Sequence, residues 1–224
     1  MEDPGMLHAW LDPLPLVAIL RGLRPEESVA VGRTIVDAGF RILEVPLNSP
    51  RPLESIGLLA EALGDRCLIG AGTVLSVEAV GEVAAAGGKL IVMPHADIEV
   101  IAAAREAGLY CVPGVSTPTE AFAALRAGAH ALKAFPAELI TPAVLRAWRA
   151  VLPLDLPVLP VGGITPNNMR DYRLAGASGF GIGSALYAPG RSVADIANAA
   201  HAFARAWTTT ESASSKTPTG HMDK

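Results

Sequence analysis

Residues 110–136, YCVPGVSTPTEAFAALRAGAHALKAFP, contain the repeating unit that decides the fold. A short apolar run, Tyr110-Gly114, precedes the capping box Thr117-Pro118-Thr119-Glu120, which has proline at the first helical position. An alanine-rich segment then ends at Ala127-Gly128, where glycine can take the left-handed conformation that terminates helices. A second apolar run, Ala131-Phe135, follows. This order predicts a strand, a helix and a second strand.

The same order of apolar run, turn and alanine-rich segment recurs along the whole chain, and Ser49-Pro50 repeats the helix-starting pair. The candidate strands are Leu16-Arg21, Ile42-Pro46, Cys67-Thr73, Leu90-Met93, Tyr110-Gly114, Ala131-Phe135, Val158-Val161 and Gly179-Ile182. Eight such units predict an α/β protein that folds as a single (β/α)8 TIM barrel, because an open doubly wound sheet usually has fewer units.

The expected domain organisation is one barrel over residues 14–207, preceded by an N-terminal extension at residues 1–13. A chain of 224 residues, 50% of them hydrophobic, is long enough to bury one large core. After Trp207 the sequence is rich in Thr, Ser and Lys and has almost no apolar residues. Such a segment cannot offset its ordering entropy, so residues 208–224 are expected to form a disordered tail.

Composition excludes several classes of partner. Lys and Arg number 18 against 22 Asp and Glu, for a formal net charge of −4 without a basic run, so we expect no nucleic acid partner. The first residues lack the features of a signal peptide, and no apolar run approaches the roughly 20 residues that span a bilayer. The sequence therefore predicts a soluble, cytoplasmic protein without a membrane partner.

The cysteines and histidines give little support to metal chemistry. Cys67 and Cys111 each lie in an apolar, β-prone run, where a buried free thiol is the usual finding. The five histidines are scattered, with no pair at the spacing of helical metal ligands. We expect no metal site.

Lys133 lies inside the apolar run Ala131-Phe135 and has no acidic neighbour in sequence. Burial disfavours the ammonium form and lowers the pKa of a lysine, so a neutral, nucleophilic amine becomes available near neutral pH. An enzyme that forms an imine needs such a nucleophile. The alternative is a lysine at a strand end whose stem packs while its ammonium group reaches water.

Glu44 is the only acidic residue inside any candidate strand. It lies on the second strand and Lys133 on the sixth, and alternate strands of a (β/α)8 barrel supply the side chains of one interior layer. We expect the two side chains to face each other near the carboxyl-terminal mouth as an acid/base and nucleophile pair. A purely structural ion pair is the alternative, although burying such a pair recovers little free energy.

The loops that follow the other strands contain candidate binding groups. Gly162-Gly163 and Gly181-Ile182-Gly183-Ser184 follow the seventh and eighth strands, where barrels of this kind bind phosphate. Arg21 ends the first strand and Thr73 the third, and together they suit a carboxylate. The alternative for Arg21 is a surface arginine at the end of a strand. His95 could relay protons, but it is more simply a polar loop residue before a helix that Asp97 could cap.

These residues lie within motifs that together resemble the class I 2-keto-3-deoxy-6-phosphogluconate/galactonate (KDPG/KHG) aldolases, over about residues 14–207. The motifs are Leu43-Glu44-Val45-Pro46-Leu47-Asn48-Ser49-Pro50, Ile69-Gly70-Ala71-Gly72-Thr73-Val74-Leu75, Pro113-Gly114-Val115-Ser116-Thr117, Leu132-Lys133-Ala134-Phe135-Pro136-Ala137-Glu138 and Val161-Gly162-Gly163-Ile164.

The resemblance implies a carbon–carbon lyase that requires no metal or organic cofactor, acts on a phosphorylated keto acid and assembles as a homotrimer. It implies that Lys133 is the Schiff-base lysine and Glu44 the acid/base. It further implies that the keto-acid end of the substrate contacts Arg21 and Thr73, and that the phosphate is bound by Gly163, Gly183 and Ser184.

Within the family, Pro46 and Asn48 resemble the galactonate branch, because gluconate-type members typically have threonine and arginine in this loop. The implied reaction is cleavage of 2-dehydro-3-deoxy-6-phosphogalactonate to pyruvate and glyceraldehyde 3-phosphate.

Three alternatives stay open. The first is the same chemistry on the gluconate epimer, which a comparison of the two substrates would distinguish. The second is a phosphosugar isomerase or phosphate-binding synthase, which would form no borohydride-trapped adduct with pyruvate. The third is a phosphosugar-binding or regulatory barrel without turnover, against which the pairing of Lys133 with Glu44 argues.

Overall fold

Strands and helices alternate along the chain in the computed structural model, which describes the backbone of residues 5–214 and the side chains of residues 7–209. The elements are α1 (Gly5–Leu11), β1 (Leu16–Ile19), α2 (Pro25–Asp37), β2 (Ile42–Pro46), α3 (Pro52–Leu63), β3 (Leu68–Gly72), α4 (Val77–Ala85), β4 (Leu90–Val92), α5 (Ile98–Glu106), β5 (Tyr110–Val112), β6 (Gly114–Val115), α6 (Pro118–Ala127), β7 (Leu132–Ala134), α7 (Pro142–Arg149), β8 (Val158–Pro160), α8 (Met169–Leu174), β9 (Phe180–Ile182) and α9 (Val193–Ser214).

The strands form two sheets in which every pairing is parallel. A six-stranded sheet has the order β5-β4-β3-β2-β1-β9, and a three-stranded sheet has the order β6-β7-β8. An isolated parallel bridge between Val161 and Gly181 connects the chain after β8 to β9. The predicted α/β class with parallel strands is confirmed, whereas the closed eight-unit barrel stays a prediction.

Each predicted strand has a counterpart in the structure, but the fifth is divided into β5 and β6 at Pro113. Proline has no backbone N–H, so it cannot donate to a ladder and interrupts the strand. Its carbonyl still accepts a hydrogen bond from the backbone N–H of Lys133 at 2.9 Å. Although the fifth strand is divided, β7 still pairs with a strand on each side, and Lys133 lies between β6 and β8.

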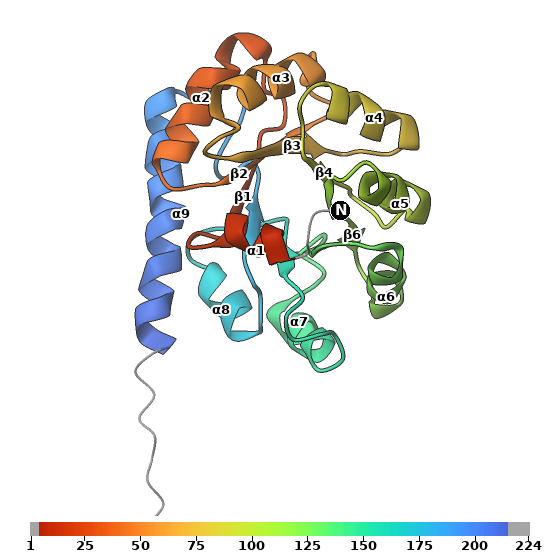
Figure 1. Ribbon diagram of the computed structural model, residues 1–224. Helices are drawn as coiled ribbons and strands as arrows, with labels where there is room; N and C mark the ends of the chain where they lie inside the picture. Colours follow the sequence, from red (N-terminus) through yellow and green to blue (C-terminus); the bar gives the residue numbers. More distant parts are fainter. Residues whose placement is uncertain (1–4, 215–224) are drawn as a thin grey trace, which may run out of the picture.

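Helices surround the strands, and α1 lies across one end of them (Figure 1). Leu7 and Leu11 of α1 are buried and pack with Ile42 and Leu68, the first residues of β2 and β3. Helix α1, which lies within the predicted N-terminal extension, therefore covers the amino-terminal end of the strands. The predicted binding residues Arg21, Thr73, Gly163, Gly183 and Ser184 follow the opposite, carboxyl-terminal ends of their strands, whereas Glu44 and Lys133 lie in the middle of β2 and β7.

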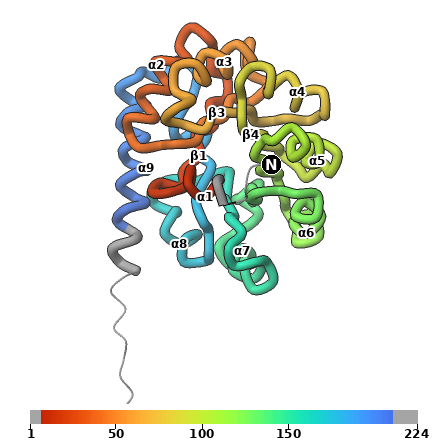
Figure 2. The backbone as a smooth tube through the Cα atoms, in the orientation of Figure 1, coloured from red at the N-terminus to blue at the C-terminus, as the bar shows by residue number. Residues whose placement is uncertain are grey.

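Two local predictions are wrong. Ser49 does not start a helix, because α3 begins at Pro52 after Arg51 and the Ser49 hydroxyl instead accepts a hydrogen bond from the backbone of Gly22. The chain also stays helical beyond Trp207, since α9 continues to Ser214. The coloured part of α9 lies beside α2 and α8 (Figure 2). Residues 208–214 are thus not a disordered tail, and residues 215–224 lie outside the described range.

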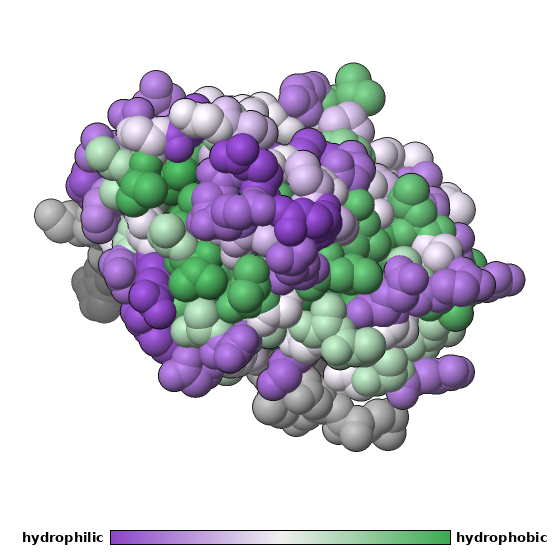
Figure 3. Space-filling model, turned by 90° about the horizontal axis from the view of Figure 1, so that it is seen from above, coloured by the Kyte–Doolittle hydropathy of each residue, from purple (hydrophilic) through white to green (hydrophobic). Residues whose placement is uncertain are grey.

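On the face that Figure 3 shows, polar side chains alternate with several groups of apolar ones. Large exposed apolar side chains include Leu75, which is 55% exposed, and Ile98, which is 54% exposed. No helix within residues 5–214 is long and apolar enough to cross a membrane. The cytoplasmic location stays a prediction.

Candidate active site

Lys133 lies at the centre of β7, paired in register with Gly114 of β6 and Leu159 of β8. Its side chain is only 7% exposed, and its Nζ lies 4.6 Å from the centroid of the Phe135 ring. Burial lowers the pKa of Lys133, and the positive charge of Arg21 lowers it further, while the carboxylate of Glu44 opposes the shift. Lys133 is therefore a buried amine biased toward its neutral form.

Glu44 lies at the centre of β2 and is 1% exposed. Burial raises its pKa to about 7, although the positive charges of Lys133 and Arg21 oppose this shift. Its Oε2 atom has no hydrogen-bond partner among the described residues. A carboxyl group with a pKa near neutrality and an unpaired oxygen can both accept and return a proton.

Two cavities meet at Lys133. A small cavity of about 20 Å³ lies beside Lys133 and Glu44, and its remaining lining residues are apolar side chains and Gly181. This volume is of the order that holds one water molecule. A second cavity of about 370 Å³ also reaches Lys133 and is lined by Ile19, Arg21, Thr73, Pro94, Lys133, Phe135, Val161, Gly162, Gly163, Ile164, Thr165, Gly181, Gly183, Ser184 and Ala185.

Gly72, the last residue of β3, makes room for the Glu44 carboxyl group. A Cβ atom at Gly72 would collide with both carboxyl oxygens and with Cδ of Glu44. Sequence reasoning did not identify Gly72 as a residue of the site. The signal available was a glycine inside a strand, which often marks a place where another group approaches the backbone closely.

The carboxylate-binding groups predicted after β1 and β3 line the larger cavity, as does Lys133. Arg21 is held by Asn48, whose Oδ1 accepts a hydrogen bond from Nη1 of Arg21 at 2.7 Å. Thr73 has a φ of +55°, in the left-handed region that β-branched residues rarely adopt. Such strain is typical of functional sites, where the surrounding structure holds a residue in an unfavourable conformation.

The glycines predicted to bind phosphate lie along the same cavity. Gly162 and Gly163 have φ values of +111° and +59°, so the turn after β8 requires glycine at both positions. A Cβ atom at Gly183 would meet nothing within 4 Å, so the backbone next to Ser184 is open to a ligand. All the predicted site residues except Glu44 therefore line one cavity, and Glu44 shares the smaller one with Lys133.

The remaining candidates lie apart from this cavity. The exposed His95 side chain lies near Asp97, with 4.0 Å between Nε2 and Oδ2, and Asp97 caps α5 as the sequence indicated. Cys67 and Cys111 are free and buried, as predicted, and burial raises the pKa of each thiol to about 12. Among the described residues, no three His, Cys, Asp or Glu side chains are grouped as metal ligands.

The arrangement can bind and activate a carbonyl compound. The amine of Lys133 can attack a carbonyl carbon, and Glu44 can transfer the protons that imine chemistry requires. Arg21 and the loops at Gly163 and Gly183 line the same cavity and can bind anionic groups of a ligand.

Comparisons with known proteins agree with this chemistry. A sequence model of the KDPG and KHG aldolases matches residues 7–198. The 2-dehydro-3-deoxy-6-phosphogalactonate aldolase of Escherichia coli (strain K12) is 48% identical over 198 residues, which are 88% of this chain and 97% of that protein.

Two solved structures are also similar. One, described as "Native KDPGal structure", has a TM-score of 0.89 and 47% identity over 91% of this chain and 98% of its own. The other is a cube-shaped, highly porous cage designed by fusing symmetric oligomeric domains. It has a TM-score of 0.89 and 46% identity over 91% of this chain and 76% of its own.

Proposed function

The chain belongs to the KDPG and KHG aldolase family, and we propose that it cleaves 2-dehydro-3-deoxy-6-phospho-D-galactonate to pyruvate and D-glyceraldehyde 3-phosphate. It does so as a class I aldolase, through a Schiff base on the enzyme. The observation that carries the proposal is the position of Lys133, a buried amine of lowered pKa that lies beside Glu44 and opens onto a cavity large enough for the substrate.

The reaction begins when Nζ of neutral Lys133 attacks the C2 ketone. The carbonyl oxygen takes up protons and leaves as water, which produces an iminium ion that can accept an electron pair. Glu44 supplies and recovers these protons, directly or through a water molecule. Its raised pKa of about 7 suits this exchange near neutral pH.

Carbon–carbon cleavage follows from the iminium ion. Glu44 removes the proton of the C4 hydroxyl, the C3–C4 bond breaks, and its electron pair moves into the iminium to form an enamine. Glyceraldehyde 3-phosphate leaves. The enamine takes a proton at C3, and water hydrolyses the resulting imine to pyruvate and free Lys133.

The substrate is oriented by its two anionic ends. The carboxylate next to C2 is placed at Arg21 and Thr73, and the phosphate at the backbone amides of Gly163 and Gly183 with the hydroxyl of Ser184. Support comes from the shared cavity, which all five residues line together with Lys133.

We place the strands in one closed (β/α)8 barrel that forms a single domain. The bridge between Val161 and Gly181 joins the two sheets at one seam, and only Pro113 separates β5 from β6 at the other. We also propose a homotrimer, in which exposed apolar side chains such as Leu75 and Ile98 face a second copy. The similarity to a fused symmetric oligomeric domain supports this assembly.

The function is tested by supplying each C4 epimer to the purified protein and coupling pyruvate release to lactate dehydrogenase and NADH. We expect turnover, with the galactonate epimer cleaved at least as efficiently as the gluconate epimer. Pro46 ends β2, the strand of Glu44, and Asn48 lies in the turn after it, so they change the polar groups near C4, where the epimers differ. A kcat/KM that favours the gluconate epimer more than about tenfold would reassign the substrate but keep the mechanism.

A further inference from the structure

A hydrogen bond joins Arg21, just beyond β1, to Asn48, in the turn after β2. Nη1 of Arg21 donates to Oδ1 of Asn48 at 2.7 Å, and both residues are exposed. An exposed arginine has many accessible rotamers unless a partner holds it in one. We propose that Asn48 is a positioning residue that holds the guanidinium of Arg21 at the substrate carboxylate. The inference rests on the function proposed above.

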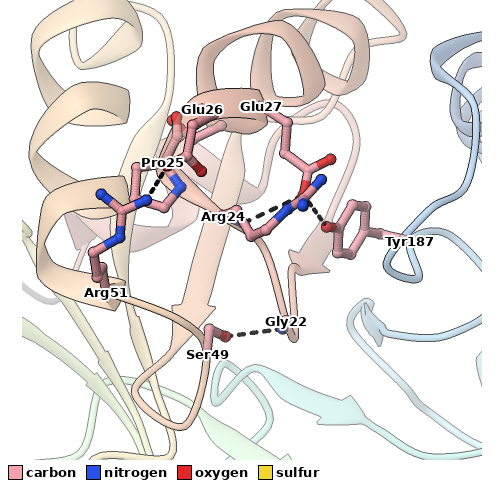
Figure 4. Close-up of polar contacts among 9 residues, drawn as sticks. Gly22, Arg24, Pro25, Glu26, Glu27, Ser49, Arg51 and Tyr187 are labelled. Carbon is pink, nitrogen blue, oxygen red and sulfur yellow. Dashed lines mark hydrogen bonds and ion pairs between the residues drawn. The ribbon is translucent and has the colours of Figure 1, made fainter.

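The backbone beside Arg21 is already fixed from two sides. The N–H of Gly22 donates to the hydroxyl of the buried Ser49 at 2.9 Å, which ties the turn after β1 to the turn after β2 (Figure 4). Gly22 has a φ of +84°, and a Cβ atom there would collide with Pro189. With the backbone held in this way, the side-chain torsions of Arg21 are what Asn48 still has to restrain.

The neutral side chain of Asn48 distinguishes this contact from its neighbours. Arg24 forms an ion pair with Glu27 at 3.2 Å, and Arg51 forms ion pairs with Glu26 and Glu54 (Figure 4 draws the pair with Glu26). Among the described residues, Arg21 has no such carboxylate partner. An amide oxygen orients the guanidinium without cancelling its charge, so the charge remains available to a substrate carboxylate.

The position of Arg21 also acts on the catalytic pair. The charged groups that act on Glu44 are Lys133 and Arg21, and those that act on Lys133 are Glu44 and Arg21. The positive charge of Arg21 lowers the pKa of both Glu44 and Lys133. If the guanidinium moves away, both pKa values rise, and a higher pH is needed to deprotonate the two groups.

The test compares Asn48→Ala, Arg21→Ala and the double variant in the pyruvate-release assay, over a range of pH. Asn48→Ala is expected to raise KM about fivefold to tenfold, the order expected from losing one hydrogen bond to a charged group at an exposed position. It should also move the acid limb of the pH profile to higher pH. Arg21→Ala should raise KM more than Asn48→Ala does, and the double variant should have nearly the same KM as Arg21→Ala alone.

Asn198→Ala is the matched control, because Asn198 is an exposed asparagine on α9, an element that contributes no residue to the cavity. It should retain wild-type KM and pH dependence. An Asn48→Ala effect that adds in full to that of Arg21→Ala would show that Asn48 acts independently of Arg21 and would overturn the proposal. An Asn48→Ala variant with the KM and pH dependence of the wild type would also overturn the proposal. A wild-type protein that releases no pyruvate would instead overturn the proposed function itself.

Discussion

The carboxyl group of Glu44 occupies the space that a Cβ atom on Gly72 would fill. Because β2 and β3 are adjacent, a methyl group at Gly72 would displace the carboxyl group rather than the strand that carries it. Misplacing a catalytic group by about 1 Å can cost about 100-fold in rate, so Gly72→Ala is expected to lower kcat by that order.

Steady-state kinetics check this expectation, with Gly81→Ala on α4 as the control. A Cβ atom at Gly81 would meet nothing within 4 Å, and alanine is the better helix former. Wild-type kcat in a folded Gly72→Ala variant would show that Glu44 does not need this space.

The second test replaces the carboxyl group of Glu44 with an amide of nearly the same shape. Glu44→Gln is expected to lose about 10²- to 10⁴-fold in turnover, the usual contribution of a general acid/base. In the wild type, activity should fall as the pH drops below about 7, where Glu44 becomes protonated. In the variant, the remaining acid limb belongs to Lys133. The limb due to Lys133 should lie at lower pH than the limb due to Lys133 in the wild type, because the negative charge of Glu44 raises the pKa of Lys133 there.

Thermal unfolding provides the folding control for Glu44→Gln. Folding raises the pKa of Glu44 above its ordinary value of 4.5, so the wild type is stabilised by the protonated form at low pH and loses that stability as the pH rises to about 7. Glutamine carries no such dependence. At pH 8 the variant is therefore expected to unfold at the same or a higher temperature than the wild type. Turnover near the wild-type level in Glu44→Gln would show that Glu44 has a structural role and is not the acid/base.

Most of the strands could be predicted because the pattern that defines them is local. Apolar runs and helix signals such as Thr117-Pro118 depend on neighbouring residues, and the structure has Thr117 as the cap of α6. That Lys133 and Glu44 lie beside one cavity could also be predicted from the sequence, because buried charged residues are rare in strands and alternate strands share interior layers.

Contacts between loops far apart in sequence could not be predicted. Ser49 has the residue type of a helix cap, but its hydroxyl accepts from Gly22 instead, and this depends on where the turn after β1 lies. Predicting the role of Gly72 would likewise require knowing where the Glu44 side chain points. The strand break at Pro113 could have been foreseen, since proline inside a strand argues against a continuous ladder.

The phosphate site is best tested at Gly183, because it has room for a side chain and lacks the positive φ of Gly162 and Gly163. Gly183→Val should place a side chain into the phosphate end of the cavity and raise KM for the phosphorylated substrate at least tenfold, of the order of 1.4 kcal/mol. Enamine formation from pyruvate alone, followed by deuterium exchange at its methyl group, should be nearly unchanged. Equal losses in both assays would place the phosphate elsewhere.

Chelation tests whether a metal takes part. The sequence and the described residues offer no group of metal ligands, so overnight dialysis against EDTA is expected to leave kcat and KM unchanged. The same treatment of a zinc-dependent aldolase serves as the positive control. Activity that is lost on dialysis and restored by one divalent ion would contradict the proposed mechanism.

The central claim is that Lys133 forms an imine with the substrate, and borohydride reduction in the presence of pyruvate tests it most directly. The reduction should add one covalent group to the protein, located on Lys133 by peptide mass spectrometry, because only an imine to a neutral amine can form and be reduced in this way. Lys133→Arg should take no label and show no turnover, since a guanidinium stays protonated, whereas Lys89→Arg, at an exposed lysine, should label normally. Labelling at another lysine, or none in an active wild-type protein, would contradict the account.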